Sequence, residues 1–478
     1  MASSNSKDRL LAMIRNGEHM SLRQQFLLTA QLSMPAIMAQ LSTIVMDYID
    51  ASMLGSLGAN EEASVGLVAT TWWLFTGIST AFVTGFSVQV AHKIGANKQV
   101  EARNIARQAI TACLIYGLCF SAFGIGISSF LPVWLGGNDD IAPLSSAYFF
   151  TLSSCLPILV TYLLVGGMLR WSGNMRIPSM LDILMCVLDV TFNFLLIFPT
   201  REIVVLGHSF VMPGAGLGVR GAALGSVMAI VVVCSLIVYY LVFRSNDLKL
   251  IKERGSFIPT KQCLKKAFNI SLPIGIQQFV MSSAQIFITI IIAPLGNVSI
   301  AAHSLAITAE SLCYMPGYGI ADAATSVVGQ SLGAGRRNLA RRFAYISISM
   351  GMTVMGVLAV LMFIASETMM SMMTNVQAVI DLGSSVLRIE AFAEPLFAVA
   401  LVSYGAFVGA GDTRVPCWMN NLSMWAVRLT MAWTLINVFN MGLTGMWIAM
   451  AIELNFRGII FLLRMSRGKW IKDENFKQ

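Results

Sequence analysis

Two aspartates inside a long apolar stretch are the residues whose type and position first suggest chemistry. Asp47 and Asp50 lie in the apolar run from residue 27 to 57, which can cross a bilayer because about 20 apolar residues span the hydrocarbon core. A carboxylate at the centre of such a helix costs about 2.5–3.5 kcal/mol on insertion scales. A chain that keeps this cost generally uses the charge, so we expect an ion-handling centre of a transport protein here.

The second half of the chain has its own charged residues inside apolar runs. Glu453 and Arg457 are four residues apart, so they share one face of a helix. For these two we favour a network of buried ion pairs, which also includes Arg388 and Arg428.

Three further acids of this half leave two interpretations open. Glu390 and Glu394 are also four residues apart, and Glu310 lies in an earlier apolar run. They either support buried ion pairs or present an exposed carboxylate that attracts cationic substrates. Asp47 is open in the same way, between a supporting and a direct role, whereas Asp322 is expected to be solvated or to cap a loop.

The composition determines the class of fold that positions these residues. Of the 478 residues, 56% are hydrophobic and only 12% are charged, whereas soluble domains carry about 25% charged residues. The apolar runs are long and unbroken, which excludes the alternating ten-residue segments of a membrane barrel. The eight scattered cysteines and four separated histidines predict neither a disulfide framework nor a metal site.

Twelve apolar runs predict twelve membrane-spanning helices. Of the 32 lysines and arginines, only Arg201 and Arg220 fall on the expected outer side and three lie within spans. This asymmetry places both termini in the cytoplasm, explains the net charge of +8 and argues against a nucleic-acid partner. The runs lie at about residues 27–57, 63–91, 108–134, 142–169, 177–199, 215–243, 267–295, 299–330, 343–366, 378–409, 415–440 and 441–463.

An internal repeat divides these spans into two halves. Pro35 aligns with Pro273, and the same offset along the chain aligns Gly95-Ala96 with Gly333-Ala334 and the Gly-x-x-Arg-x-Pro turn at 173–178 with that at 411–416. Because each half has six spans, both enter the membrane from the same side. The predicted fold is an all-α polytopic membrane protein, with twelve transmembrane helices in two parallel six-helix repeats around a central cavity.

The repeat predicts five segments. They are a cytoplasmic N-terminal segment (1–25), an N-lobe (26–243), a cytoplasmic linker (244–266), a C-lobe (267–464) and a cytoplasmic tail (465–478).

These motifs resemble those of the MATE (multidrug and toxic compound extrusion) transporters of bacterial type. The resemblance rests on the Gly-Asn/Asp-x-Arg-x-Pro turns, the Gly-Ala loops after the second and eighth spans, and Ala301-Ala-His-Ser-Leu. It implies a secondary antiporter of the inner or plasma membrane that exports organic compounds against an inward Na⁺ or H⁺ gradient. It further implies no cofactor other than the coupling ion, and we expect the protein to work as a monomer.

The resemblance also maps a cation site of the family onto the N-lobe. The positions are Asp50, Asp189 and Asn193, and Gly225-Ser226 stands where the family has Ala-Thr. Counted at about 1.5 Å per residue, the four polar side chains lie at similar depths in the outer half of the membrane. Such oxygens suit a hard cation such as Na⁺ or a shared proton, although hydrogen bonds that merely join helices remain an alternative.

The second lobe departs from one branch of the family. Met281 and Phe397 stand where some relatives carry a glutamate and an aspartate, and Ile288 is the repeat partner of Asp50. We therefore expect the coupling site to be one-sided.

Other classes of function find little support. Gly216-Leu-Gly-Val-Arg-Gly221 fits a dinucleotide fingerprint, but no βαβ unit is expected around it, and we interpret it as a loop. The sequence lacks a Walker motif, and no enzyme site is expected. The alternatives to an antiporter are a flippase for a lipid-linked precursor, and a channel or membrane sensor.

Overall fold

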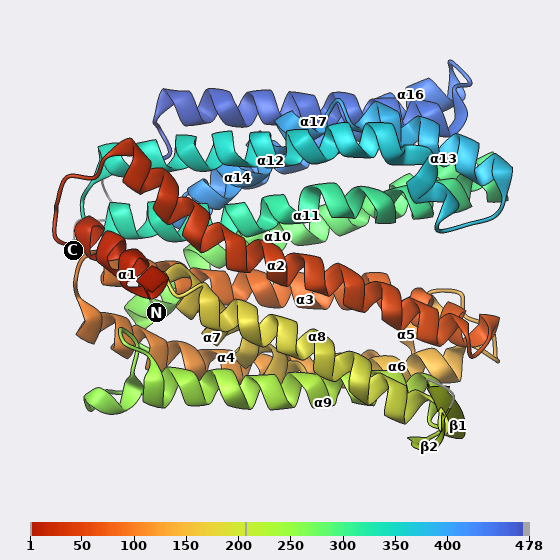
Figure 1. Cartoon of the computed structure of the whole chain (residues 1–478), viewed down its shortest axis with the longest axis horizontal. Coiled ribbons are helices and arrows are strands. Elements are labelled where there is room, and N and C mark those ends of the chain that lie inside the picture. The colour runs from red at the N-terminus through yellow and green to blue at the C-terminus, as the bar shows by residue number, and fades with distance from the viewer. Residues whose placement is uncertain (1, 206–207, 472–478) are drawn as a thin grey trace.

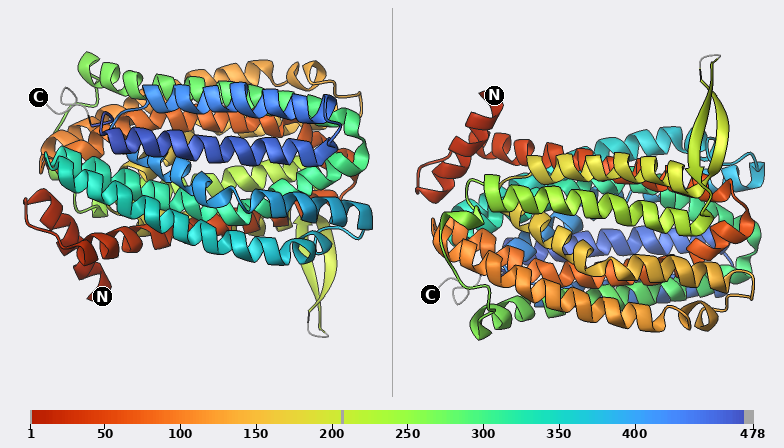
Figure 2. Two further views of the ribbon diagram at one scale, coloured as in Figure 1. Left: turned by 90° about the horizontal axis from the view of Figure 1, so that it is seen from above. Right: turned by 90° about the horizontal axis from the view of Figure 1, so that it is seen from below.

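Helices dominate the structure because a membrane-spanning segment must satisfy its backbone hydrogen bonds internally. The computed structural model describes residues 2–205 and 208–471, and nearly all helices run along one long axis (Figure 1). The N-terminal helix α1 (Ala2–Arg15) and the last residues of α17 (Gly442–Arg467) lie at one end of the bundle. A hairpin of β1 (Pro199–Val205) and β2 (His208–Ala215) projects at the other end (Figure 2).

The predicted twelve spans are all helical, and the fold is confirmed. The first half consists of α2 (Leu22–Gly55), α3 (Ala59–Gly95), α4 (Gln99–Ile127), the short α5 (Leu131–Trp134), α6 (Ala142–Ser154), α7 (Leu156–Trp171), α8 (Arg176–Ile197) and α9 (Gly218–Tyr239). The second consists of α10 (Lys261–Ile292), α11 (Asn297–Gly333), α12 (Arg337–Ser371), α13 (Gln377–Glu390), α14 (Glu394–Gly409), α15 (Arg414–Leu422), the π-helix η4 (Ser423–Leu429), α16 (Thr430–Asn437) and α17.

Eight of these helices are individually long and apolar enough to cross a membrane, and two bent pairs qualify together. Helix α11 and the α15–η4–α16 segment occupy the two remaining predicted spans. The antiparallel hairpin of β1 and β2 lies in the connection between α8 and α9 and was not predicted.

The two bends occur at equivalent places in the two halves. Helices α6 and α7 meet at 50°, and α13 and α14 meet at 60°. Pro157 and Pro395, which are related by the repeat offset, lie in the first turn of α7 and α14, where proline is tolerated but cannot continue the preceding helix. The second bend separates Glu390 from Glu394, so the expectation that these two residues share one helix face is wrong.

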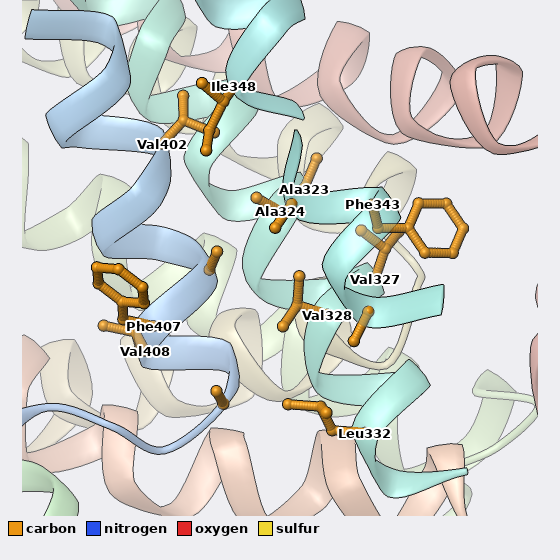
Figure 3. Packing of buried hydrophobic residues seen from close by; sticks show 14 of the residues in the cluster. Ala323, Ala324, Val327, Val328, Leu332, Phe343, Ile348, Val402, Phe407 and Val408 are labelled. Carbon is orange, nitrogen blue, oxygen red and sulfur yellow. The ribbon is translucent and has the colours of Figure 1, made fainter. Parts of the chain in front are cut away.

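Each lobe packs on the other through its first two spans. Helix α2 packs along α11, and α3 packs along α10. The largest apolar cluster lies where α11, α12 and α14 meet, and Figure 3 shows Val327, Phe343 and Phe407 among its members. The close approach of α14 to α11 depends on small residues, since a Cβ on Gly405 would lie 2.5 Å from the Ala321 carbonyl oxygen.

The lobes touch most closely at the end that carries α1. A Cβ on Gly95 would overlap the Gln330 carbonyl oxygen, and a Cβ on Gly333 would overlap the His92 carbonyl oxygen. Both pairs obey the repeat offset. The two lobes therefore close on each other about a pseudo-twofold axis, with glycine at both crossing points.

Hydrogen bonds follow the same symmetry. His92 Nε2 lies 2.7 Å from the Gly409 carbonyl oxygen, and Gln330 Nε2 donates to the Trp171 carbonyl oxygen at 3.2 Å. Trp171 and Gly409 are again related by the repeat offset, so the closure is a reciprocal pair of contacts.

Helix α1 lies across this closed end and contacts both lobes. Its buried Leu11 and Ile14 join the same apolar cluster. Arg15 donates both terminal nitrogens to Asp247, at 3.1 and 3.0 Å, in the connection between the lobes. From the second lobe, Arg336 donates to the Met13 carbonyl oxygen at 2.8 Å and so satisfies a carbonyl at the C-terminal end of α1.

Candidate functional site

The structure brings the first three predicted N-lobe residues into contact. Asp50 on α2 faces α8, where Asp189 and Asn193 lie one turn apart. Asn193 Nδ2 donates to Asp50 Oδ1 at 3.0 Å and to Asp189 Oδ2 at 2.9 Å. Asp189 and Asn193 are buried, whereas Asp50 is half-buried. One amide thus bridges two carboxyl groups from two helices.

Helix α9 completes the site from the third side. The Asp189 carboxyl group interacts with the side chains of both Ser226 and Asp50. Gly225 leaves the space into which Asn193 fits, because a Cβ there would overlap Asn193 Oδ1. All four predicted positions therefore belong to one cluster.

Asp47 lies beside this cluster and is not part of its hydrogen bonds. Its side chain is exposed and interacts with Asp189 only through charge. This arrangement fits the supporting role among the two that the sequence left open.

Ionising both Asp50 and Asp189 at once would cost free energy in this cluster. Two adjacent carboxylates in a poorly solvated site repel each other, so one shares a proton or a cation lies between them. The Asn193 amide group presents donors to both carboxyl groups, which accommodates a single negative charge spread over the pair.

The predicted ion-pair network of the C-lobe forms around one acid. Glu453 is fully buried; its Oε2 lies 2.7 Å from Arg428 Nη2, and its Oε1 lies 2.6 Å from Arg457 Nη2. Ser423 donates to Oε1 at 2.5 Å. Ser423 and Arg428 both lie on the π-helix η4, which carries the two donors to the same carboxylate.

Arg388 does not belong to this network, and that prediction is wrong. Its Nε donates to Ser366 Oγ at 3.0 Å, and its side chain is exposed on a different face of the lobe. Arg388 and Glu390 lie two residues apart on α13, so they face opposite sides of the helix, and Glu390 is buried whereas Arg388 is exposed.

The structure buries the three remaining acids, which excludes the exposed-carboxylate interpretation for this conformation. Glu310 is 3% exposed, and Glu390 and Glu394 are fully buried. Arg428 attracts Glu310 and Glu390 electrostatically, and Cys313 lies against Glu394. Within the described residues Glu390 accepts no hydrogen bond.

One polar cluster was missed at the sequence level. Asp182 on α8 accepts a hydrogen bond from Tyr162 and pairs with Arg170 Nη2 at 2.5 Å. Asp322 from the C-lobe interacts with Arg170 and with Trp171, so our expectation of a solvated or loop-capping residue is wrong. Asp182 lies seven residues before Asp189, a spacing that places both acids on one helix face and could have revealed it.

Two related lobes of six spans each pack on each other, with an acidic cluster in one of them, and this architecture is typical of membrane transporters built from internal repeats. The chain belongs to the MatE family, whose sequence model matches residues 35–195 and 273–434. The two matches begin at Pro35 and Pro273, the two prolines that the repeat aligns. The chain is therefore a multi-pass member of a family of multidrug efflux transporters, which act on small molecules and are not enzymes.

Curated relatives support the same assignment over almost the whole chain. A probable multidrug resistance protein NorM of Thermotoga maritima is 24% identical over 446 residues, which cover 92% of each chain. The NorM protein of Neisseria meningitidis serogroup B is 26% identical over 450 residues, covering 92% of this chain and 93% of the relative.

Solved structures agree in fold. A transporter of the MOP superfamily from Pyrococcus furiosus superposes with a TM-score of 0.85 at 21% identity and covers 96% of this chain and 98% of its own. A MATE family transporter described as outward-facing gives the same score, identity and coverage. These matches confirm the fold of twelve spans in two lobes.

Proposed function

We propose that this protein is a secondary antiporter that exports organic, cationic or amphipathic compounds in exchange for an entering cation. In this proposal the cation is held by Asp50, Asp189 and Asn193, with Ser226 beside them. The observation that carries the proposal is the Asn193 amide group bridging two carboxyl groups of different helices. A cation that binds there changes the interaction between α2 and α8, so it favours one arrangement of these helices over another.

We take H⁺ rather than Na⁺ as the coupling cation of this proposal. Asn193 presents its NH₂ group to both carboxyl groups, while its Oδ1 points to Gly225. Na⁺ prefers oxygen ligands, so its binding between the carboxylates would require this amide group to turn over. A proton fits the pair as it stands.

The proposed transport cycle alternates the two lobes between openings at opposite ends. The reciprocal contacts at the α1 end support it, because two related surfaces that close symmetrically can also part together. We propose that the α1 end and both termini face the cytoplasm. We further propose that the protein lies in the inner membrane and works as a monomer.

Transport by purified protein in proteoliposomes tests the coupling. Export of a fluorescent organic cation should be driven by an inward H⁺ gradient and should proceed at the background rate under a Na⁺ gradient alone. Export under Na⁺ alone at the H⁺-driven rate would reject the proton, and export without any ion gradient at that same rate would reject antiport.

A second prediction concerns α1 as a clamp of the closed end. Replacing Arg15 by Ala removes the contacts with Asp247, which are worth about 1 kcal/mol for a partly exposed ion pair. We expect the cytoplasm-open population to rise about fivefold. The measurement is the rate at which a maleimide labels Ser326→Cys. Ser326 is buried and donates a hydrogen bond to the Trp171 carbonyl oxygen, so labelling requires the closed end to open. The background carries Cys119→Ser because Cys119 is exposed.

Arg9→Ala provides the matched control, because Arg9 is an exposed arginine on the same helix. It should leave the labelling rate unchanged. If Arg15→Ala, Arg9→Ala and the protein with an unchanged α1 are labelled at the same rate, the Arg15–Asp247 contact does not hold the lobes closed.

A further inference from the structure

A groove on the outer surface of the C-lobe contains a cationic side chain that the proposed transport cycle does not use. It has a volume of about 320 Å³ and lies between α12, the bend of α13 and α14, and α17. Helices α12 and α17 lie on the side of the C-lobe away from the N-lobe (Figure 1). The groove is lined by Phe363, Arg388, Ile389, Phe392, Ile448, Ala451, Ile452 and Asn455.

This surface faces lipid, because its neighbourhood is apolar and exposed. On α12 the exposed side chains include Val360 and Ile364, and on α17 they include Phe456 and Ile459. In a membrane protein such a surface contacts acyl chains, whereas charged side chains within the membrane generally face the bundle interior or pair with one another.

Arg388 departs from that rule. It lies near the end of α13, about 16 Å along the helix from residue 377 at 1.5 Å per residue, and it is exposed. Its Nε donates to Ser366 Oγ at 3.0 Å, and Ser366 is about 8 Å from the end of α12 by the same count. The side chain thus extends towards the end of the bundle that carries the β1–β2 hairpin, as a long basic side chain does when it reaches for the membrane interface.

The guanidinium group lacks a protein counter-ion. Among the described residues, no carboxylate lies within ion-pair distance of Arg388, and its Nε donates to the neutral Ser366 hydroxyl group. None of the residues that line the groove is acidic. An anion supplied by the surroundings would therefore complete the environment of this guanidinium group.

Aromatic and aliphatic side chains form the rest of the groove. Phe363 and Phe392 meet edge to face, with ring centroids 5.7 Å apart, and Phe392 is 74% exposed. Ile389 and Ile452 add apolar walls. An occupant that matches this groove has one anionic group and a long apolar part.

We propose that the groove binds one glycerophospholipid of the outer leaflet, with its phosphodiester on Arg388 and an acyl chain along Phe363, Phe392 and Ile452. Arginine suits this role because its planar donors match the oxygens of a phosphate in a bidentate geometry. Phospholipid is also the anion that the membrane itself presents to this face. The proposal is independent of the coupling ion and of the transport mechanism; its choice of leaflet rests on the proposed cytoplasmic location of the α1 end.

Native mass spectrometry of the purified full-length protein in detergent tests this proposal. The probes are dioleoyl phosphatidylglycerol and dioleoylglycerol, which share both acyl chains and differ in the phosphate. The unsubstituted protein should retain one phosphatidylglycerol at least about tenfold more tightly than dioleoylglycerol. Arg388→Met should abolish that preference, and Arg388→Lys should keep part of it.

Two further variants keep the result interpretable. Ile452→Trp retains the guanidinium group but fills the groove at a lipid-facing position, and it should also lose the bound lipid. Arg220→Met removes an exposed arginine from the start of α9 and should retain it. Unchanged phosphatidylglycerol binding in Arg388→Met or in Ile452→Trp, or equal binding of both probes by the unsubstituted protein, would overturn the proposal.

Discussion

Asp50→Asn is expected to abolish cation-driven export while leaving substrate binding intact. The substitution keeps the size of the side chain but removes the charge that the Asn193 amide group contacts at 3.0 Å. An amide at position 50 still accepts a hydrogen bond but carries no negative charge and takes up no proton near neutral pH, so the cluster loses the carboxyl group proposed to bind the cation. Proteoliposome export under an H⁺ gradient should fall to the level of empty liposomes.

Asp47→Asn is the matched control, because it removes the same charge one turn away on the same helix. Asp47 is exposed and interacts with the cluster only through charge. It should retain more than about half of the export rate, since exposed charges contribute little. If both variants export as well as the unsubstituted protein, Asp50 has no coupling role.

Glu453→Gln is expected to have the largest effect on stability. The fully buried carboxylate is the shared partner of Arg428 and Arg457, so the change leaves two buried guanidinium groups facing a neutral amide. Breaking a buried ion pair from one side costs about 3–5 kcal/mol. The free energy of unfolding, measured by denaturant titration in detergent micelles, should fall by this amount.

Glu367→Gln tests whether any loss of a glutamate has this effect. Glu367 lies exposed on α12, and its substitution should change the free energy of unfolding by less than about 0.5 kcal/mol. A loss below about 1 kcal/mol for Glu453→Gln would contradict the network as the structure presents it.

The sequence was sufficient to predict the lobes and the members of the N-lobe cluster. Hydropathy determines where helices cross the membrane, and the constant repeat offset relates Gly95 to Gly333, which the structure places at reciprocal crossing points. Asp189 and Asn193 could be assigned to one face because helical periodicity is a local property. Their contact with Asp50 depended on the family resemblance and not on spacing.

Other features could not be predicted because they depend on helix breaks and on packing between distant segments. The spacing of Glu390 and Glu394 suggested one helix face, but the chain bends by 60° between them. Arg388 was assigned to the ion pairs because it lies within an apolar run of the same lobe, but its side chain is exposed. The pairing of Arg170 with Asp182, and the contact of Asp322 with both α7 residues Arg170 and Trp171, require knowledge of how α7, α8 and α11 meet.

Proton release on substrate binding is the most direct measurement of the claim that Asp50, Asp189 and Asn193 hold the coupling cation. Purified protein in a weakly buffered solution with a pH indicator is mixed with an exported organic cation, and the released protons are counted. Because coupling between two ligands is reciprocal, a substrate that competes with the proton must release it. We predict release from the unsubstituted protein and from Asp47→Asn, and none from Asp50→Asn; equal release from all three would contradict the account.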